Sequence, residues 1–192
     1  ATPSTFYVLL EFESPGEQPL ANALTAFEQC TSQGWVTDGI VASSEGQNRS
    51  LWQYRERISE SITSRTPYKN DIAVRISQVP EFLYEVEQVL GTEYPDFEIV
   101  WFGHIGDGNL HLNILKPEEM LADQFKKQCE QVSKSVLAVV QEFGGSVSAE
   151  HGIGLMKKGQ LHFSRSEEEI ASLRLIKTIF DPDRIMNPGK LL

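Results

Sequence analysis

The sequence predicts an α+β fold that is ferredoxin-like, single or duplicated, with an antiparallel sheet and helices packed mainly on one face. Segments rich in β-branched and aromatic residues alternate with segments whose apolar residues recur at helical spacing. An Asp-Gly pair at Asp107-Gly108, between two apolar runs, is typical of a hairpin that joins antiparallel strands. No short-period repeat or low-complexity linker divides the 192 residues. We therefore expect one domain over residues 1–192.

The first third of the chain is expected to hold two strands and two helices. Thr5–Glu13 has the composition of a strand and is closed by a turn at Ser14-Pro15-Gly16. Pro19–Gln33 carries apolar residues at helical spacing, and Trp35–Ser43 is typical of a second strand. Residues 47–64 predict a second helix with an apolar stripe along one side.

The rest of the chain continues the alternation and adds the hairpin. Its predicted elements are a strand at 71–78, a helix at 81–90, hairpin arms at 98–105 and 110–115, a long helix at 117–143, a short strand at 146–149 and a helix at 166–180. The last helix begins at Ser166, and Glu169 three residues later completes a capping box. It ends at Asp181-Pro182.

Composition and charge argue against nucleic-acid binding and indicate the cellular compartment. A formal net charge of −10 argues against binding to nucleic acid, which needs a basic surface. Cys30 and Cys129 lack CxxC spacing and are expected to be free thiols in a reducing compartment. Neither a transmembrane run nor a signal peptide is visible, so we expect a cytoplasmic protein. The chain begins without Met in a strand-like run, and we expect it to be part of a longer protein.

Two of the four histidines flank the predicted turn. Counting outward from Asp107-Gly108 places His104 directly opposite His111, with Cβ atoms about 5 Å apart on one face of the hairpin. Asn113, two residues further along, shares that face. Two imidazoles at this separation can occupy adjacent corners of a tetrahedral metal site, which needs at least one more protein ligand.

The segment AEHGIG offers that third ligand, because Glu150 and His151 are adjacent and flanked by small residues. Neighbouring residues of an extended segment point to opposite sides, so one of the two can join the histidines. Two histidines and a carboxylate suit zinc, although iron, manganese and cobalt use similar ligands. The alternative is an ordinary hairpin with unrelated histidines, and we assign His162 no metal role.

One basic stretch interrupts the acidic composition, with six basic and three acidic residues around the second predicted helix and the strand after it. Arg55 and Ser59 are four residues apart and would share a helix face, and Lys69 follows in the next loop. A guanidinium and an ammonium together suit the carboxylate of a small organic acid. The alternative is a solvated helix face on which Arg57 pairs with Glu60.

Five motifs in this order resemble the C-terminal substrate domain of the FAD-linked oxidase family: RERISES, PYKND, FGHIGDGNLHLNI, SAEHGIGLMKK and KTIFDPDRIMNPGKLL. This family belongs to the vanillyl-alcohol oxidase superfamily and includes D-2-hydroxyglutarate dehydrogenase, D-lactate dehydrogenase and the glycolate oxidase flavin subunit. In such proteins an N-terminal FAD-binding domain precedes the substrate domain, and we expect no such domain within these 192 residues. The resemblance implies FAD, a divalent metal such as zinc, a 2-hydroxy acid substrate and an electron acceptor, and it allows a homodimer.

Position by position, the resemblance also implies roles for individual residues. It makes the metal ligands His104, His111 and Glu150. It places on the substrate side His151, Arg55, Ser59, Lys69 and Asn113, with Ser59 standing where the 2-hydroxyglutarate enzymes have threonine. Asn187, in the closing Asn-Pro-Gly, is the residue that it places near the flavin.

The implied reaction is oxidation of a D-2-hydroxy acid, with His151 as general base and flavin as hydride acceptor. Without the flavin, this chain alone is expected to show no dehydrogenase turnover. Two rival functions are a metal-dependent hydrolase, since the same ligands can activate water, and a non-catalytic module that binds small acids. The identity of the acid, among 2-hydroxyglutarate, lactate, malate and glycolate, stays open.

Overall fold

The structure is a computed structural model that describes residues 3–13, 16 and 18–192. Two residues of the expected Ser14-Pro15-Gly16 turn, Ser14 and Pro15, lie outside the described residues. The chain divides into two compact units, Ala1–Glu60 and Ser61–Leu192.

The second unit is built on a three-stranded antiparallel sheet. Its strands are β1 (Tyr68–Ala73), β2 (Ile99–His104) and β3 (Asn109–Ile114), in the spatial order β1-β3-β2. An isolated antiparallel bridge between Ala73 and Ser146 adds a fourth position beside β1. The middle strand is therefore β3, which carries His111 and is flanked on both sides.

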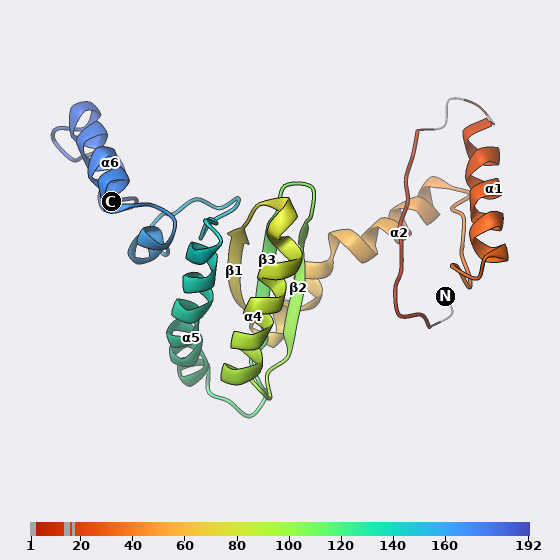
Figure 1. Ribbon diagram of the computed structural model, residues 1–192, viewed down its shortest axis with the longest axis horizontal. Helices are drawn as coiled ribbons and strands as arrows, with labels where there is room; N and C mark the ends of the chain where they lie inside the picture. Colours follow the sequence, from red (N-terminus) through yellow and green to blue (C-terminus); the bar gives the residue numbers. More distant parts are fainter. Residues whose placement is uncertain (1–2, 14–15, 17) are drawn as a thin grey trace. The chain divides into compact units, whose positions relative to one another are not determined.

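Two long helices cover one face of this sheet. α4 (Val79–Glu93) connects β1 to β2, and α5 (Ala122–Glu142) follows β3, so that the order of elements is β-α-β-β-α and then the bridge. The two helices lie side by side over the sheet (Figure 1). This arrangement confirms the α+β class and matches one ferredoxin-like unit.

The core lies between the sheet and these two helices. It contains Ile72, Leu110, Leu112, Ile114, Phe82, Val86, Leu90, Phe125, Cys129, Val136 and Val140. Since alternate residues of a strand point to opposite faces, the residues between the core positions lie on the other face. That face is polar: it carries Asp71 on β1 and Asn109, His111 and Asn113 on β3.

The first unit contains helices but no strand among its described residues. Its helices are α1 (Gln18–Ser32), α2 (Glu45–Glu56) and α3 (Ile58–Ser61), the last of which ends one residue beyond the unit. The strands expected at Thr5–Glu13 and Trp35–Ser43 are wrong, because a strand needs a hydrogen-bonded neighbour and these segments make no ladder. The expected duplication of the sheet is therefore not formed.

Several boundaries differ from the prediction for local reasons. The strand expected at 71–78 is β1, which ends at Ala73 because the N–H of Val74 bonds to Gly108 O (3.1 Å) and the chain then turns into η2 (Ile76–Gln78). The helix expected from Pro117 begins at Ala122, after a turn that Met120 closes. The C-terminal part adds η3 (Lys158–Phe163) and α6 (Glu167–Phe180), and η1 (Thr63–Arg65) precedes β1. Among the described helices, none is both long and apolar enough to cross a membrane.

Candidate metal and substrate site

The loop between β2 and β3 has four residues, 105–108, and not the expected two. The N–H of Asp107 bonds to His104 O (3.2 Å), and only Gly108 of the Asp-Gly pair has a positive φ (+71°). A type I′ turn would need positive φ at both residues. As a result His104 pairs with Asn109, and the predicted direct pairing of His104 with His111 is wrong by two residues.

The two histidines nevertheless share one face of the sheet. A shift of two residues restores the same side, because side chains alternate with a period of two along a strand. His104 and His111 are thus diagonal neighbours, and their ring centroids lie 5.6 Å apart at an interplanar angle of 86°. Although the register differs by two residues from the predicted one, His104 and His111 are still next to each other.

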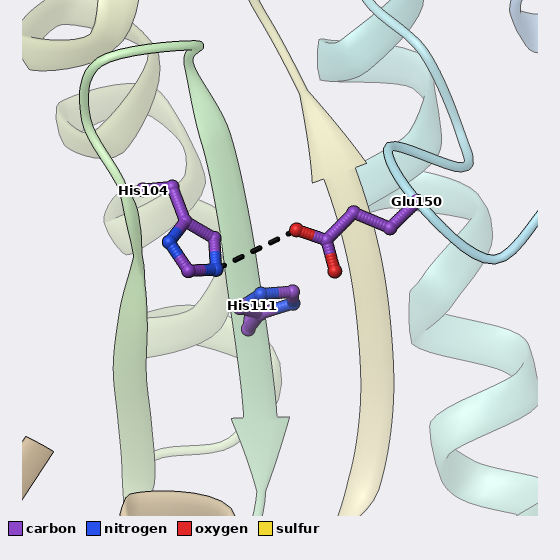
Figure 2. A group of neighbouring side chains, drawn as sticks. All are labelled: His104, His111 and Glu150. Atoms are coloured by element: carbon purple, nitrogen blue, oxygen red, sulfur yellow. Dashed lines mark ion pairs between the residues drawn. The ribbon is translucent and has the colours of Figure 1, made fainter. Parts of the chain in front are cut away.

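Glu150 completes the His-His-Glu cluster, by which we mean His104, His111 and Glu150. It lies in the loop after the Ala73–Ser146 bridge, and its Oε1 is 3.5 Å from His104 Nε2. One potential ligand atom from each of the three residues lies within 4.8 Å of the other two. Figure 2 shows the Glu150 carboxylate beside the two rings. Of the two candidates left open by the spacing, Glu150 is the one that the fold brings to the histidines.

Asn109 holds the Glu150 carboxylate in place. Its side-chain Nδ2 donates to Glu150 Oε1 (2.6 Å), and the residue itself is buried. The side chains of His104 and Glu150 are 38% and 48% exposed, whereas that of His111 is 14% exposed. The cluster therefore has an inner wall formed by the sheet and an outer side open to solvent.

Asp71 is a buried carboxylate at this site that sequence reasoning missed. It lies on β1 directly opposite His111, and its Oδ2 accepts hydrogen bonds from the backbone N–H groups of Glu150 (3.1 Å) and His151 (3.2 Å). These two bonds tie the Glu150 loop to the edge of the sheet. The available signal was a carboxylate directly before the apolar Ile72 of a predicted strand, and it became informative only once the pairing of β1 with β3 was known.

Charge and burial set the protonation of these groups. Burial alone would raise the pKa of Asp71, but the two backbone N–H donors and the positive charge of Lys157 outweigh it and hold that pKa below its ordinary value. Burial lowers the pKa of His111 despite the nearby carboxylates. This direction favours the neutral imidazole, which is the form that binds a metal.

The donor set fits a divalent metal. Two imidazoles and one carboxylate are the shell of many catalytic zinc sites, in which three protein ligands leave a position for water or substrate. The open outer side of the cluster provides room for such a position. The assignment of these three residues as metal ligands stays a prediction.

Two of the residues predicted to bind substrate lie on the same face. Lys69 and Asn113 are paired across β1 and β3, one alternation away from the Asp71–His111 pair, which is about 7 Å along the strands. Lys69 is exposed. Asn113 is buried, and its Nδ2 donates to the backbone oxygen of His111 (3.1 Å).

Arg55 and Ser59 belong to the first unit, whereas the cluster lies in the second. The single helix expected over 47–64 is wrong: it breaks at Arg57 into α2 and α3, with Arg55 on one side and Ser59 on the other. A shared helix face for this pair therefore loses its basis. Arg57 instead forms a two-bond salt bridge with Glu60 (2.7 and 2.8 Å), which is the surface pair weighed as the alternative.

The other three positions weighed from the sequence, His151, Asn187 and His162, are all exposed. His151 follows Glu150, and its exposed side chain places Nδ1 3.4 Å from Asp71 Oδ2. Asn187 is exposed in a turn with φ +45°, where the N–H of Lys190 bonds to its carbonyl oxygen (3.3 Å). His162 is exposed and lies against Phe163, with ring centroids 4.2 Å apart and ring planes tilted by 36°, and it is not part of the cluster.

Comparison with known proteins supports the interpretation of the motifs. Residues 1–191 match the family model described as FAD linked oxidases, C-terminal domain. The chain belongs to this family. The resemblance drawn from the five motifs is thereby confirmed, and membership in an FAD-linked family implies FAD as the cofactor.

Relatives in this family share much of the sequence. Two bacterial proteins named D-2-hydroxyglutarate dehydrogenase are 54% identical over 190 residues (Stutzerimonas stutzeri, strain A1501) and 52% identical over 186 residues (Xanthomonas citri pv. viticola). A mitochondrial protein of that name from Danio rerio is 33% identical over 196 residues. These alignments cover 99%, 97% and 100% of this chain but 41%, 39% and 35% of the relatives. The chain thus spans about two fifths of the length of the bacterial relatives.

Proposed function

We propose that this chain forms the metal- and substrate-binding part of an FAD-dependent dehydrogenase that oxidises a D-2-hydroxy acid to the 2-oxo acid. The observation that carries the proposal is the His-His-Glu cluster, with His151 anchored beside it, in a chain of the FAD-linked oxidase family. The bacterial relatives are named for 2-hydroxyglutarate. We therefore propose 2-hydroxyglutarate ahead of lactate as the acid.

Each residue of the site has a chemical task in this proposal. His104, His111 and Glu150 hold a divalent metal, for which zinc is our choice. A metal bound there would supply Lewis-acid polarisation of the substrate's C2 hydroxyl and carboxylate. His151 takes the hydroxyl proton at its Nε2, because its Nδ1 faces Asp71.

The negative charges of the acid require cationic partners. Lys69, on the polar face of the sheet, is proposed to pair with a substrate carboxylate. Arg55, Ser59 and Asn113 are proposed to join it as further substrate-binding residues, and Asn187 to contact the flavin. The flavin supplies the two-electron chemistry of the reaction.

Several wider features of the protein are part of the same proposal. An FAD-binding domain, an electron acceptor outside this chain and a homodimer are proposed from the family. A cytoplasmic location is proposed because neither cysteine forms a disulfide.

Metal titration of this chain tests the cluster. We expect stoichiometric binding of Zn²⁺, measured by competition with a chromophoric chelator. His104→Ala should weaken it by more than about 100-fold, since loss of a ligand costs more than loss of a residue that only orients one. His162→Ala is the matched control and should leave the affinity unchanged. Absence of stoichiometric metal in the unmutated chain would overturn the metal site.

The reaction itself needs the chain joined to an FAD-binding domain. Such a protein, assayed with a dye as electron acceptor, should reduce the dye in the presence of a D-2-hydroxy acid and lose this activity on treatment with a chelator. Esterase or amidase activity without flavin, together with no dye reduction by any 2-hydroxy acid, would favour a metal-dependent hydrolase and reject the dehydrogenase.

A further inference from the structure

The Asp71 carboxylate faces two histidines with its two oxygens. Its Oδ1 lies 3.5 Å from His111 Nδ1, and its Oδ2 lies 3.4 Å from His151 Nδ1. One of these histidines belongs to the His-His-Glu cluster, and the other is the proposed base. The Asp71 side chain therefore lies beside both a proposed metal ligand and the proposed general base.

The Asp71 carboxylate is held inside the fold, because its side chain is only 5% exposed. Lys157 supplies the opposing charge: its Nζ is 3.7 Å from Asp71 Oδ2 and donates to the backbone oxygens of Asp71 (3.1 Å) and Val147 (2.8 Å). Among the described residues, none donates a hydrogen bond to the buried Oδ1. The ring nitrogen facing it is His111 Nδ1, and the small approach needed to form that bond would satisfy both atoms.

A neutral imidazole carries one N–H and one lone pair, and the group that accepts the N–H decides which nitrogen is left to act. In both His111 and His151 the nitrogen facing Asp71 is Nδ1. An Nδ1–H directed to the carboxylate leaves Nε2 with the lone pair in each ring. A metal needs that lone pair on His111, and a substrate proton needs it on His151.

We propose that Asp71 is a positioning residue that fixes the Nδ1–H tautomer of both His111 and His151. This inference rests on the proposed function for the meaning of the two Nε2 atoms, whereas the tautomers themselves are a property of the chain alone. It couples the metal shell to the base, since displacement of one carboxylate would disturb both. Asn109 supports the cluster at a different point, because its Nδ2 donates to the Glu150 carboxylate.

The competing explanation is that Asp71 merely anchors the loop through the N–H groups of Glu150 and His151. Asp71→Asn separates the two roles. The amide keeps one oxygen, which can still accept from the two backbone N–H groups, but its NH₂ is a donor and cannot accept from His111 Nδ1–H. The loop anchor thus survives in this variant, while the tautomer preference of His111 is lost.

The first experiment needs no mutation. Long-range ¹H–¹⁵N correlation spectra of the metal-free chain at pH 8, which report imidazole tautomers, should show His111 with its proton on Nδ1. In Asp71→Asn the His111 proton should move to Nε2. A proton on Nε2 of His111 in the unmutated chain would overturn the proposal, even if the variant failed to fold.

The second experiment measures metal affinity. Asp71→Asn should weaken Zn²⁺ binding by about 10- to 100-fold, the range for residues that orient a metal-ligating histidine. Asp181→Asn is the matched control: Asp181 is also buried, accepts from the backbone N–H groups of Ile185 (2.9 Å) and Met186 (3.2 Å) and pairs with a lysine, Lys177 (2.7 Å). Its replacement should leave the Zn²⁺ affinity unchanged.

The outcomes separate the two proposals. If the unmutated chain binds no metal, the metal site falls, and the tautomer spectra alone then support or overturn the role of Asp71. If the unmutated chain binds metal and Asp71→Asn binds it equally well with His111 unchanged in tautomer, the positioning role is overturned and the metal site stands.

Discussion

The second unit, which contains the sheet and is called the sheet unit below, and the N-terminal segments of the first unit have similar apolar sequences. Their apolar side chains are buried in the sheet unit and exposed in the N-terminal segments. In the sheet unit, apolar side chains of β1 and β3 such as Ile72 and Leu112 are fully buried under α4 and α5. In the first unit, Phe6, Val8 and Leu10 are 84%, 80% and 79% exposed. An apolar, β-branched run therefore becomes a strand only where another edge supplies hydrogen bonds and a helix covers one face.

The helices show the same contrast. α4 and α5 each bury a continuous stripe of side chains against the sheet. α1, α2 and α6, whose residues are all described, contain no buried residue. In most short helices, packing of an apolar face supplies most of the stability. Since α1, α2 and α6 bury no residue, their helical structure depends on local features such as caps.

Removal of one phenylalanine in each region gives the largest contrast. Phe82 is completely buried and packs edge-on against Phe143, with ring centroids 5.5 Å apart. Phe82→Ala should lower the free energy of unfolding by about 3 to 5 kcal/mol through the cavity it leaves. Phe6→Ala should change it by less than about 0.5 kcal/mol. Urea unfolding followed by far-UV circular dichroism measures both, and a comparable loss for Phe6→Ala would mean that the N-terminal segment is packed in solution.

Two glycines with nearly equal positive φ angles sharpen the comparison. Gly108 has φ +71° and Gly34 has φ +72°, but a Cβ on Gly108 would lie 1.9 Å from Val74 O, whereas one on Gly34 meets nothing within 4 Å. Each change to Ala costs about 1 to 2 kcal/mol for the left-handed conformation. Gly108→Ala adds about 1 to 3 kcal/mol for the clash.

The same urea unfolding experiment compares the two glycine variants. Gly108→Ala should be the less stable by the cost of the clash, since the conformational cost is common to both. Equal losses would show that the Val74 contact at the end of the hairpin relaxes without cost.

These contrasts show which parts of the structure could be predicted from sequence. The capping box at Ser166 and the periodic helices at 81–90 and 166–180 depend on neighbours in the chain, and they were located closely. The hairpin was also found, but its register was not, because the Asp-Gly pattern does not reveal that Gly108 must make room for Val74 O.

The site divides in the same way. The juxtaposition of His104 and His111 could be anticipated because a two-residue slip keeps the same face of a strand. Spacing alone left Glu150 and His151 as alternatives for the third ligand, and the family resemblance pointed to Glu150. The part played by Asp71 could not be anticipated, since it depends on the pairing of β1 with β3 and on a loop some eighty residues later. Apolar periodicity predicts one helix that carries both Arg55 and Ser59, but the structure breaks it at Arg57. Periodicity alone does not reveal such a local break.

The two cysteines report on burial in each region. Cys129, on α5, is fully buried, and burial raises the pKa of its thiol to about 11. At pH 8 only about one in a thousand of these thiols would be ionised. Cys30, on α1, is partly exposed. A chromogenic disulfide reagent should therefore react with Cys129 at least about 100-fold more slowly than with Cys30.

Two variants assign the rates in this experiment. Cys30→Ser should remove the fast phase of labelling and leave the slow one, and Cys129→Ser should do the reverse. Labelling of Cys129 should also accelerate in urea along the unfolding curve. Fast labelling of Cys129 without denaturant would contradict the burial of α5 against the sheet.

The smallest effect is expected at the cap of α6. Ser166 accepts from the N–H of Glu169 (3.2 Å), and the Glu169 side chain accepts from the N–H of Ser166 (2.8 Å). Ser166→Ala should cost about 1 kcal/mol and Ser166→Gly a few tenths, because glycine leaves the N–H groups open to water. Since α6 buries no side chain, this loss should appear as faster amide hydrogen exchange within α6, with α5 unchanged. Equal acceleration of exchange in α5 would show that α6 unfolds together with the rest of the sheet unit and does not depend on its own cap.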